Sequence, residues 1–295
     1  MTHPDLPVHR LTSPHLQVEM LAQAGPRITR LTIVDSPDNL LAETPDIHWP
    51  TAYGEYYLWG GHRLWRAPEI PLQTYVPETN GLSIESLPDG VHLFGTTDAH
   101  TGIRKSLEIH LHPHRPTLMV IHHLHNEGPR PVSMAAWAIT QLPLGGVALL
   151  PQPRRPLADN PFAPNRLFVF WPYACVNDSR LEWGDDLVQV HGRATGGEPF
   201  KLGCFDSTGW CAYLRRGTLF VKRFDQRPDC RYADFGCNVE VYVNDGFLEL
   251  ETLGPLEEVP PGASTTHVET WEVHPLPTEN ALPTASLLKS CGLLE

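Results

Sequence analysis

Apolar and polar residues alternate in short runs along most of the chain. Leu16–Leu21 (LQVEML) and residues 27–34 (RITRLTIV) show this alternation, and residues 266–274 show it again. Successive side chains of a strand point to opposite faces, so these runs predict β-strands with one buried face. Further strand-like runs occupy residues 91–97, 104–112, 116–126, 132–142, 166–171, 186–191, 209–214, 219–224, 238–243 and 247–253.

The breaks between some of these runs predict hairpins. Residues 113–115 (PHR) separate the runs at 104–112 and 116–126, and Asn244-Asp245-Gly246 separates the runs at 238–243 and 247–253. Asp-Gly between two strand-like runs is a common hairpin turn. Helix signals are short by comparison, and the best of them covers residues 284–290 (TASLLKS).

About a dozen strands with almost no helix predict an all-β chain. Alternation with one polar face is typical of antiparallel sheets stacked on each other, so we expect a large antiparallel β-sandwich. A propeller is disfavoured because no repeat of ~20–50 residues is visible. The proline-rich stretch at residues 151–164 is expected to be a long loop within a single domain that spans residues 1–295.

The composition supports this fold class. The 295 residues include 30 Pro and 23 Gly, and only 19% are charged, against a typical ~25%. Proline breaks helix interiors and suits turns and strand edges, so its frequency argues against a helical bundle. Hydrophobic residues make up 41% of the chain, which is enough for a core and argues against intrinsic disorder.

The charge balance narrows the range of partners. Lys and Arg number 22 against 34 Asp and Glu, for a net charge of −12, and no long basic run is present. Nucleic acids and anionic membranes attract clustered basic residues, so neither is expected as a partner. No stretch approaches the ~20 apolar residues of a membrane span, and the first residues contain no apolar signal region. The six cysteines never take CxxC spacing, so we expect reduced, mostly buried thiols in a cytoplasmic protein.

Residues 53–69 (YGEYYLWGGHRLWRAPE) combine aromatic and charged groups at unusual density. His62, Arg63, Trp65 and Glu69 stand close together around the Gly-Gly pair. A sugar presents C–H faces to aromatic rings and hydroxyls to charged groups, so this segment is a candidate sugar-binding region. The alternative is that the aromatic rings are core residues and the charges form a salt-bridged turn.

Two further segments carry candidate site residues. Trp137 and Gln141 lie in a strand-like run that precedes Gly145-Gly146, and the alternative for this run is a buried strand with a core Trp. Lys222 and Asp234 precede LELETLGP, where Glu249 and Glu251 share one strand face. Two buried carboxylates on one face repel each other, so one of them is expected to have a raised pKa, as a general base requires. The alternative is a pair of solvent-exposed glutamates.

Histidines gather in the predicted hairpin of residues 104–126. His110 and His112 share a strand face, and so do His123 and His125. Two imidazoles on one face are the beginning of a metal site, although a third ligand is needed. Exposed histidines without a metal are the alternative.

Several separated segments resemble, in their order, an uncharacterised bacterial family of galactose-mutarotase-like proteins of the aldose 1-epimerase superfamily. They read GGHRLWRAPE, WAITQLPLGG, LFVKRF, and FLELETLGPLEEVPPG followed by HVETWEVHP. The resemblance covers about residues 16–275. It implies a β-supersandwich whose superfamily binds carbohydrates in a cleft on one sheet.

The resemblance also implies a catalytic base. In epimerases of the superfamily, a C-terminal glutamate takes the proton of the anomeric hydroxyl and a histidine protonates the ring oxygen. Residues 250–252 (LET) resemble the segment around that glutamate, which assigns the base to Glu251. The histidine precedes Tyr-Phe-Asn in those epimerases, whereas the comparable strand here reads AAWAITQ. His62, His122 and His123 are the remaining candidates for the acid.

These observations predict a carbohydrate-binding protein that works as an aldose or sugar-phosphate epimerase. Glu251 is the expected base, with His62 or His123 as the acid. The expected substrate-binding residues are Arg63, Trp65, Glu69, Trp137, Gln141, Lys222 and Asp234. Two alternatives remain: a sugar-binding protein without turnover, and a metal-dependent enzyme that uses the hairpin histidines from His110 to His125. No cofactor is expected, the expected partner is a small-molecule carbohydrate, and the oligomeric state is left open.

Overall fold

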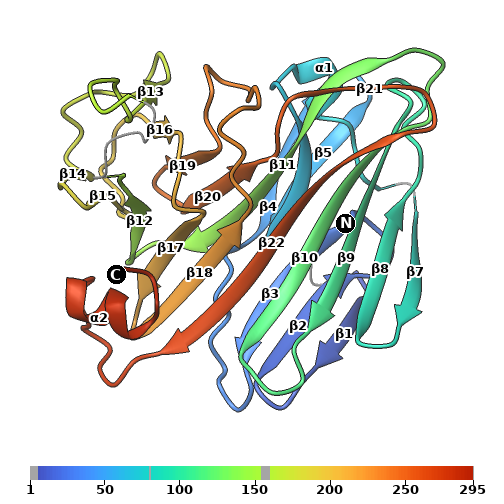
Figure 1. Ribbon diagram of the computed structural model, residues 1–295. Helices are drawn as coiled ribbons and strands as arrows, with labels where there is room; N and C mark the ends of the chain where they lie inside the picture. Colours follow the sequence, from blue (N-terminus) through green and yellow to red (C-terminus); the bar gives the residue numbers. More distant parts are fainter. Residues whose placement is uncertain (1–5, 80, 154–159, 295) are drawn as a thin grey trace.

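The computed structural model describes residues 6–79, 81–153 and 160–294. Two large antiparallel sheets make up most of this part of the chain (Figure 1). The first sheet has the order β1 (Val8–Thr12), β2 (Leu16–Leu21), β3 (Arg27–Ile33), β6 (His62–Ala67), β11 (Val132–Pro143), β20 (Phe247–Leu253), β19 (Val239–Val243), β16 (Phe200–Cys204) and β13 (Phe168–Phe170), and β21 (Glu257–Val259) also pairs with β11.

The second sheet packs against the first. Its order is β14 (Leu181–Trp183), β15 (Leu187–His191), β12 (Val147–Pro151), β17 (Trp210–Arg215), β18 (Thr218–Phe224), β22 (Ser264–Pro275), β10 (Thr117–Asn126), β9 (Ile103–Leu111), β8 (Gly90–Gly95) and β7 (Leu82–Leu87). In Figure 1 the strands β22, β10 and β9 run side by side through this layer. The all-β sandwich expected from the alternation is therefore confirmed.

The main core lies between the sheets and follows the two-residue period of the strands. Leu64, Ala136 and Leu250 from the first sheet meet Val120 and Trp271 from the second in one buried apolar cluster. The intervening residues of the first sheet point the other way. We call the side of the first sheet that is turned away from the second sheet its outer face.

The outer face is covered in part by a separate hairpin, β4 (Glu43–Thr51) and β5 (Gly54–Gly60). Tyr56 and Leu58 of this hairpin pack with Trp65 and Trp137 of the first sheet. The hairpin leads into β6 through Gly60-Gly61, both with positive φ, and a Cβ on Gly61 would lie 1.9 Å from the Ile28 carbonyl oxygen. The pair thus serves a close approach of backbone to backbone.

Both predicted hairpins and the predicted helix are confirmed. Strands β9 and β10 pair with His110 opposite Met119, and β19 pairs with β20 across residues 244–246. Helix α2 (Ala285–Ser290) begins after Thr284, whose side chain accepts a hydrogen bond from the Leu287 amide. A further short helix, α1 (Pro71–Thr74), follows β6.

Other expectations have mixed outcomes. The predicted loop at residues 151–164 lies partly outside the described residues, at 154–159. All six cysteines are free, but only Cys204, Cys211 and Cys237 are buried. No helix among the described residues is long and apolar enough to cross a membrane.

Candidate functional site

Seven side chains of the outer face form a polar and aromatic group that we call the outer-face site. They come from five neighbouring strands of the first sheet, β6, β11, β20, β19 and β16, and each is at most 8% exposed. Within each strand they alternate with residues of the main core, which explains why they share one face. The members are Arg63, Trp65, Trp137, Lys201, Glu240, Glu249 and Glu251.

The Glu251 carboxylate lies at the centre of this site and is fully buried. Its Oε2 atom accepts hydrogen bonds from Trp137 Nε1 at 2.7 Å and from Lys201 Nζ at 3.0 Å. Its Oε1 atom has no hydrogen-bond partner in the described part of the chain. One oxygen therefore orients the group, and the other is free to accept a proton or a hydrogen bond from a ligand.

Glu240 lies directly opposite Glu251 on the neighbouring strand. Lys201 Nζ lies 2.7 Å from Glu240 Oε2, so two buried carboxyl groups share one ammonium group. Burial raises the pKa of Glu240 well above its ordinary value, and the charges of Glu251 and Asp234 raise it further against the opposing effect of Lys201. Burial therefore favours the protonated form of the Glu240 carboxyl group.

Arg63 closes another side of the site. Its Nη2 donates to Glu249 Oε1 at 2.8 Å, and its guanidinium carbon lies 4.0 Å from the centroid of the Trp65 ring. Burial alone would lower the pKa of Arg63, but Glu249 raises it, so the group stays charged. Its Nε and Nη1 atoms have no partner among the described residues. Buried donors without partners are uncommon, and they mark a place where a ligand oxygen fits.

Aromatic rings form the walls of the site. Trp65 and Trp137 pack edge to face with centroids 5.5 Å apart, and Trp65 Nε1 donates to the Tyr56 hydroxyl at 2.6 Å. The Lys201 ammonium lies 4.7 Å from the Trp137 ring centroid and 4.5 Å from that of Trp171. Such rings suit both a cation and the C–H face of a sugar.

The remaining predicted residues near this face lie around its rim. Glu69 accepts a hydrogen bond from the Tyr75 hydroxyl, and the Tyr75 ring packs on Trp65 at 5.1 Å. Asp234 is partly buried, and burial raises its pKa although Lys201 opposes this. Gln141 is buried in β11, and neither atom of its amide has a partner among the described residues.

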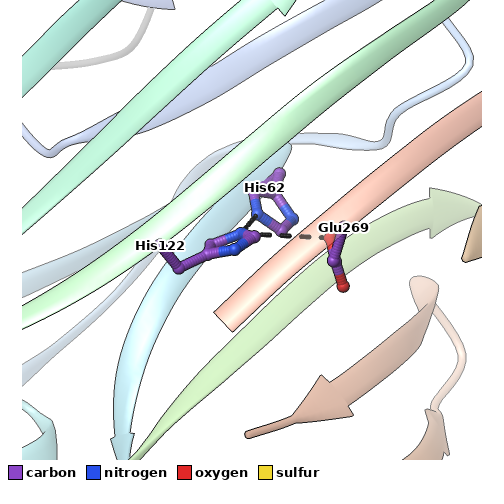
Figure 2. A group of neighbouring side chains, drawn as sticks. All are labelled: His62, His122 and Glu269. Carbon is purple, nitrogen blue, oxygen red and sulfur yellow. Dashed lines mark hydrogen bonds and ion pairs between the residues drawn. The ribbon is translucent and has the colours of Figure 1, made fainter. Parts of the chain in front are cut away.

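Two predicted residues, His62 and Lys222, lie between the sheets instead, on the side of the first sheet opposite Glu251. Figure 2 shows His62 beside His122 and Glu269. His122 Nδ1 donates to the His267 carbonyl at 2.9 Å, so its Nε2 atom accepts from His62 Nε2 at 2.7 Å. Burial is the main reason why the pKa of His62 is well below 6.5 and that of His122 falls to about 4. These are neutral core histidines that the structure does not bring to Glu251.

Lys222 is fully buried within the same group. Its Nζ atom lies 2.7 Å from Glu269 Oε1 and donates to the carbonyls of Ala138 at 3.3 Å and Leu250 at 3.1 Å. These carbonyls belong to β11 and β20, next to Trp137 and to Glu251. Lys222 therefore binds, from the space between the sheets, the two strands that carry Trp137 and Glu251 on the outer face.

His123, the other predicted acid, lies on the second sheet. It points away from the main core, with Nε2 at 3.0 Å from Glu108 and Nδ1 at 3.0 Å from the Thr266 hydroxyl. It is thus also separated from Glu251.

Three members of the outer-face site were not among the predicted site residues. Glu249 was considered only as the neighbour of Glu251 on one strand face, and the other two are Lys201 and Glu240. Each is a single charged residue in an otherwise apolar strand, FKLGC for Lys201 and VEVYV for Glu240. Charged residues are rarely fully buried unless they are paired, so this pattern is the signal that could have identified them.

A cavity of about 320 Å³ lies apart from Glu251. Arg66, Glu78 and Lys105 line it together with the stacked rings of Tyr53 and His100. Glu78 bonds to Lys105 at 2.6 Å and to Arg27 at 2.9 Å, and these cations lower its pKa against the effect of burial. Tyr53 and Arg66 belong to the candidate segment of residues 53–69, but none of the residues expected as base, acid or substrate-binding group lines this cavity.

Comparison with solved structures identifies the architecture. A candidate aldose 1-epimerase from Escherichia coli K12 has a TM-score of 0.58 and 15% identity, with 92% of this chain and 100% of that chain covered. A galactose mutarotase-like protein from Lactobacillus casei ATCC 334 has a TM-score of 0.56 and 10% identity, with 91% and 100% covered. A TPR-domain containing protein from Parabacteroides distasonis ATCC 8503 has a TM-score of 0.62 and 14% identity, with 95% and 49% covered. We found no family model and no curated protein that matches the sequence.

Proposed function

We propose that this chain, whose fold is that of the aldose 1-epimerase-like and galactose mutarotase-like structures, binds an aldose at the outer-face site and interconverts its anomers. The observation that carries the proposal is the geometry of Glu251. One carboxylate oxygen is held by Trp137 and Lys201, and the other has no partner among the described residues. A general base needs this arrangement, in which the group is oriented and one oxygen remains available.

The surroundings of Glu251 suit a neutral sugar better than a sugar phosphate. Five carboxyl groups lie in or at the rim of the site, against two cations, and the cation Arg63 is already paired with Glu249 at 2.8 Å. A phosphate would add negative charge to this surplus. The carboxyl groups are those of Glu69, Asp234, Glu240, Glu249 and Glu251, and the cations are Arg63 and Lys201.

The proposed reaction uses the two facing glutamates as base and acid. Glu251 Oε1 takes the proton of the anomeric hydroxyl while the protonated Glu240 gives its proton to the ring oxygen. The bond between the anomeric carbon and the ring oxygen breaks, and an open-chain aldehyde forms. After rotation about the C1–C2 bond, the hydroxyl attacks the other face of the carbonyl, and both protons return. Glu240 thus takes the role for which His62 and His123 were considered.

Ligand entry requires the aromatic rim to move, because Glu251 exposes no surface. Tyr173 is 39% exposed and follows β13, two residues after Trp171. Its pKa is raised mainly by burial, while Lys201 opposes this shift and Glu251 reinforces it. The rings of Trp171 and Tyr173 are the proposed cover over Lys201.

The test is a measurement of anomer exchange on a panel of neutral aldoses and their phosphates, by polarimetry and by NMR exchange. Catalysed exchange of a neutral aldose supports the proposal. Calorimetric binding without any acceleration of exchange would instead support the second candidate, a sugar-binding protein without turnover. The absence of both binding and exchange across the panel would contradict both functions.

A further inference from the structure

A second group of polar side chains lies on the exposed side of the second sheet, whereas the outer-face site belongs to the first sheet. His92 on β8, Glu108 on β9 and His123 on β10 come from three neighbouring strands. His92 lies directly opposite Glu108, and His123 lies opposite Ser106, one diagonal step away from Glu108. The side chains of this histidine–glutamate group therefore converge from three strands on one point of the sheet surface.

The spacing of the three ligand atoms suits a metal ion. His123 Nε2 lies 3.0 Å and His92 Nδ1 lies 3.9 Å from Glu108 Oε1, and each of the three residues offers one ligand atom that lies within 4.8 Å of those of the other two. Metal–ligand bonds of about 2.0–2.2 Å in a tetrahedral site place neighbouring ligand atoms roughly 3.3 Å apart. Small side-chain movements would bring the three atoms to that separation.

The strands already hold these ligands in place. Thr266 on β22 bonds to His123 Nδ1 at 3.0 Å, which leaves Nε2 directed at Glu108. His110 Nε2 lies 3.5 Å from the other oxygen of Glu108, and its Nδ1 bonds to Asp89 at 2.9 Å. Partners that orient the rings and carboxylates of a site in this way are a regular feature of protein metal centres.

The buried group of His62, His122 and Glu269 has the same residue types but does not suit a cation. The ammonium of Lys222 lies 2.7 Å from Glu269 Oε1, and Glu269 Oε2 accepts a hydrogen bond from Trp271 at 2.7 Å. A metal ion would have to displace these partners and would be repelled by Lys222. The histidine–glutamate group has side chains that are 15–25% exposed, so an ion can reach it from solvent.

We propose that His92, Glu108 and His123 bind a divalent first-row transition-metal ion, for which Zn²⁺ is the representative. Two imidazoles and one carboxylate leave the fourth tetrahedral position to water or to an external ligand. This site differs from the expected hairpin pairs, because it takes only His123 from the hairpin histidines and recruits His92 from the preceding strand. It is independent of the proposed sugar chemistry, since its residues lie on the other sheet.

The test uses the full chain, freed of metal with a chelator and titrated with ZnCl₂ by calorimetry. We expect one stoichiometric site whose affinity falls about tenfold or more in both Glu108→Gln and His92→Asn. His114→Asn, which changes an exposed histidine of the hairpin turn, is the matched control and should bind as the unaltered chain does. Titration with Co²⁺ and visible absorption should report the same site, with the absorption band lost in Glu108→Gln.

Thermal unfolding of each variant without metal checks that it still folds. If Zn²⁺ does not bind stoichiometrically, or if both variants bind it as tightly as the control, the proposed site is wrong. If Glu108→Gln does not fold, His92→Asn and His123→Asn decide the question in the same way, and neither result depends on sugar turnover.

Discussion

The carboxyl groups of Glu240 and Glu251 face each other from directly paired positions of neighbouring strands and share the ammonium group of Lys201. Their surroundings differ. Glu251 receives hydrogen bonds from Trp137 and Lys201, whereas neither oxygen of Glu240 accepts a well-directed hydrogen bond from the described residues. Pairs whose surroundings push their protonation apart are typical of acid–base catalysis.

Replacement of the proposed base should abolish most turnover. We expect Glu251→Gln to lower anomer exchange by about 10²–10⁴-fold, the usual contribution of a positioned general base. Gln keeps the size of the side chain and its contact with Trp137, so sugar binding should persist. NMR exchange measures the rate and calorimetry measures the binding. Glu258→Gln, at an exposed glutamate, is the control, and a fully active Glu251→Gln would contradict the proposed base.

Replacement of the proposed acid should also slow turnover, but with a different pH profile. We expect Glu240→Gln to lower the exchange rate by ~10²-fold or more, because the amide cannot give a proton to the ring oxygen. The unaltered chain should lose activity at high pH as Glu240 loses its proton, and this limb should disappear in the variant. If Glu240→Gln keeps both the rate and the alkaline limb of the unaltered chain, Glu240 is not the acid.

Lys222 should matter for stability even though it lies behind the site. Removal of one partner of a buried ion pair leaves the other charge without compensation and costs about 3–5 kcal/mol of unfolding free energy. We expect Lys222→Met to show this loss in denaturant unfolding and Lys222→Met combined with Glu269→Gln to show a smaller one. Lys289→Met, on the exposed part of α2, is the control. Equal losses in the single and the double variant would contradict a direct pairing.

The inter-sheet histidines should make the fold sensitive to acid. Burial lowers the pKa of His267 to about 3, so the residue stays neutral in the folded chain while it gains a proton in the unfolded chain below its ordinary value of 6.5. The unfolded state then binds more protons than the folded state. As the pH decreases, the unfolding free energy therefore falls by about 1.4 kcal/mol per pH unit, or about 2 kcal/mol between pH 6.5 and pH 5.

The measurement for this prediction is denaturant unfolding at several pH values. His267→Gln should show a flatter dependence of stability on pH than the unaltered chain across this interval. His114→Gln, at an exposed position, should leave the dependence as it is. Parallel curves for the unaltered chain and His267→Gln would show that His267 is not the titrating group.

Most of the fold could be predicted from the sequence because a two-residue period is a local signal. The strands that escaped prediction include β16 and β12, whose alternation is obscured because a strand buried on both sides has few polar positions. Part of the site could also be predicted from this two-residue period. Glu251, Arg63, Trp65 and Trp137 meet on one face, as the candidate segments suggested. The domain organisation and the roles of these residues stay predictions.

The remaining site residues could not be placed because their surroundings come from distant strands. His62 and Arg63 are neighbours in the chain, so in a strand they must point to opposite faces, and only the pairing of β6 with β11 shows which of them meets Glu251. Lys222 resembled a ligand-binding cation, but its partner Glu269 comes from another strand of the second sheet. A charge shows its partner only once the sheets are assembled.

The complete burial of β20 has a consequence for how the chain selects its pairing. All seven residues from Phe247 to Leu253 are buried, so apolar burial alone does not distinguish the observed register from one shifted by a single residue. The polar residues do distinguish them. A one-residue slip would turn Glu251 toward Glu269 and away from Lys201, and would leave Arg63 without Glu249. The same charged residues that are proposed to bind and convert a sugar therefore also fix the pairing register of the strand that carries them.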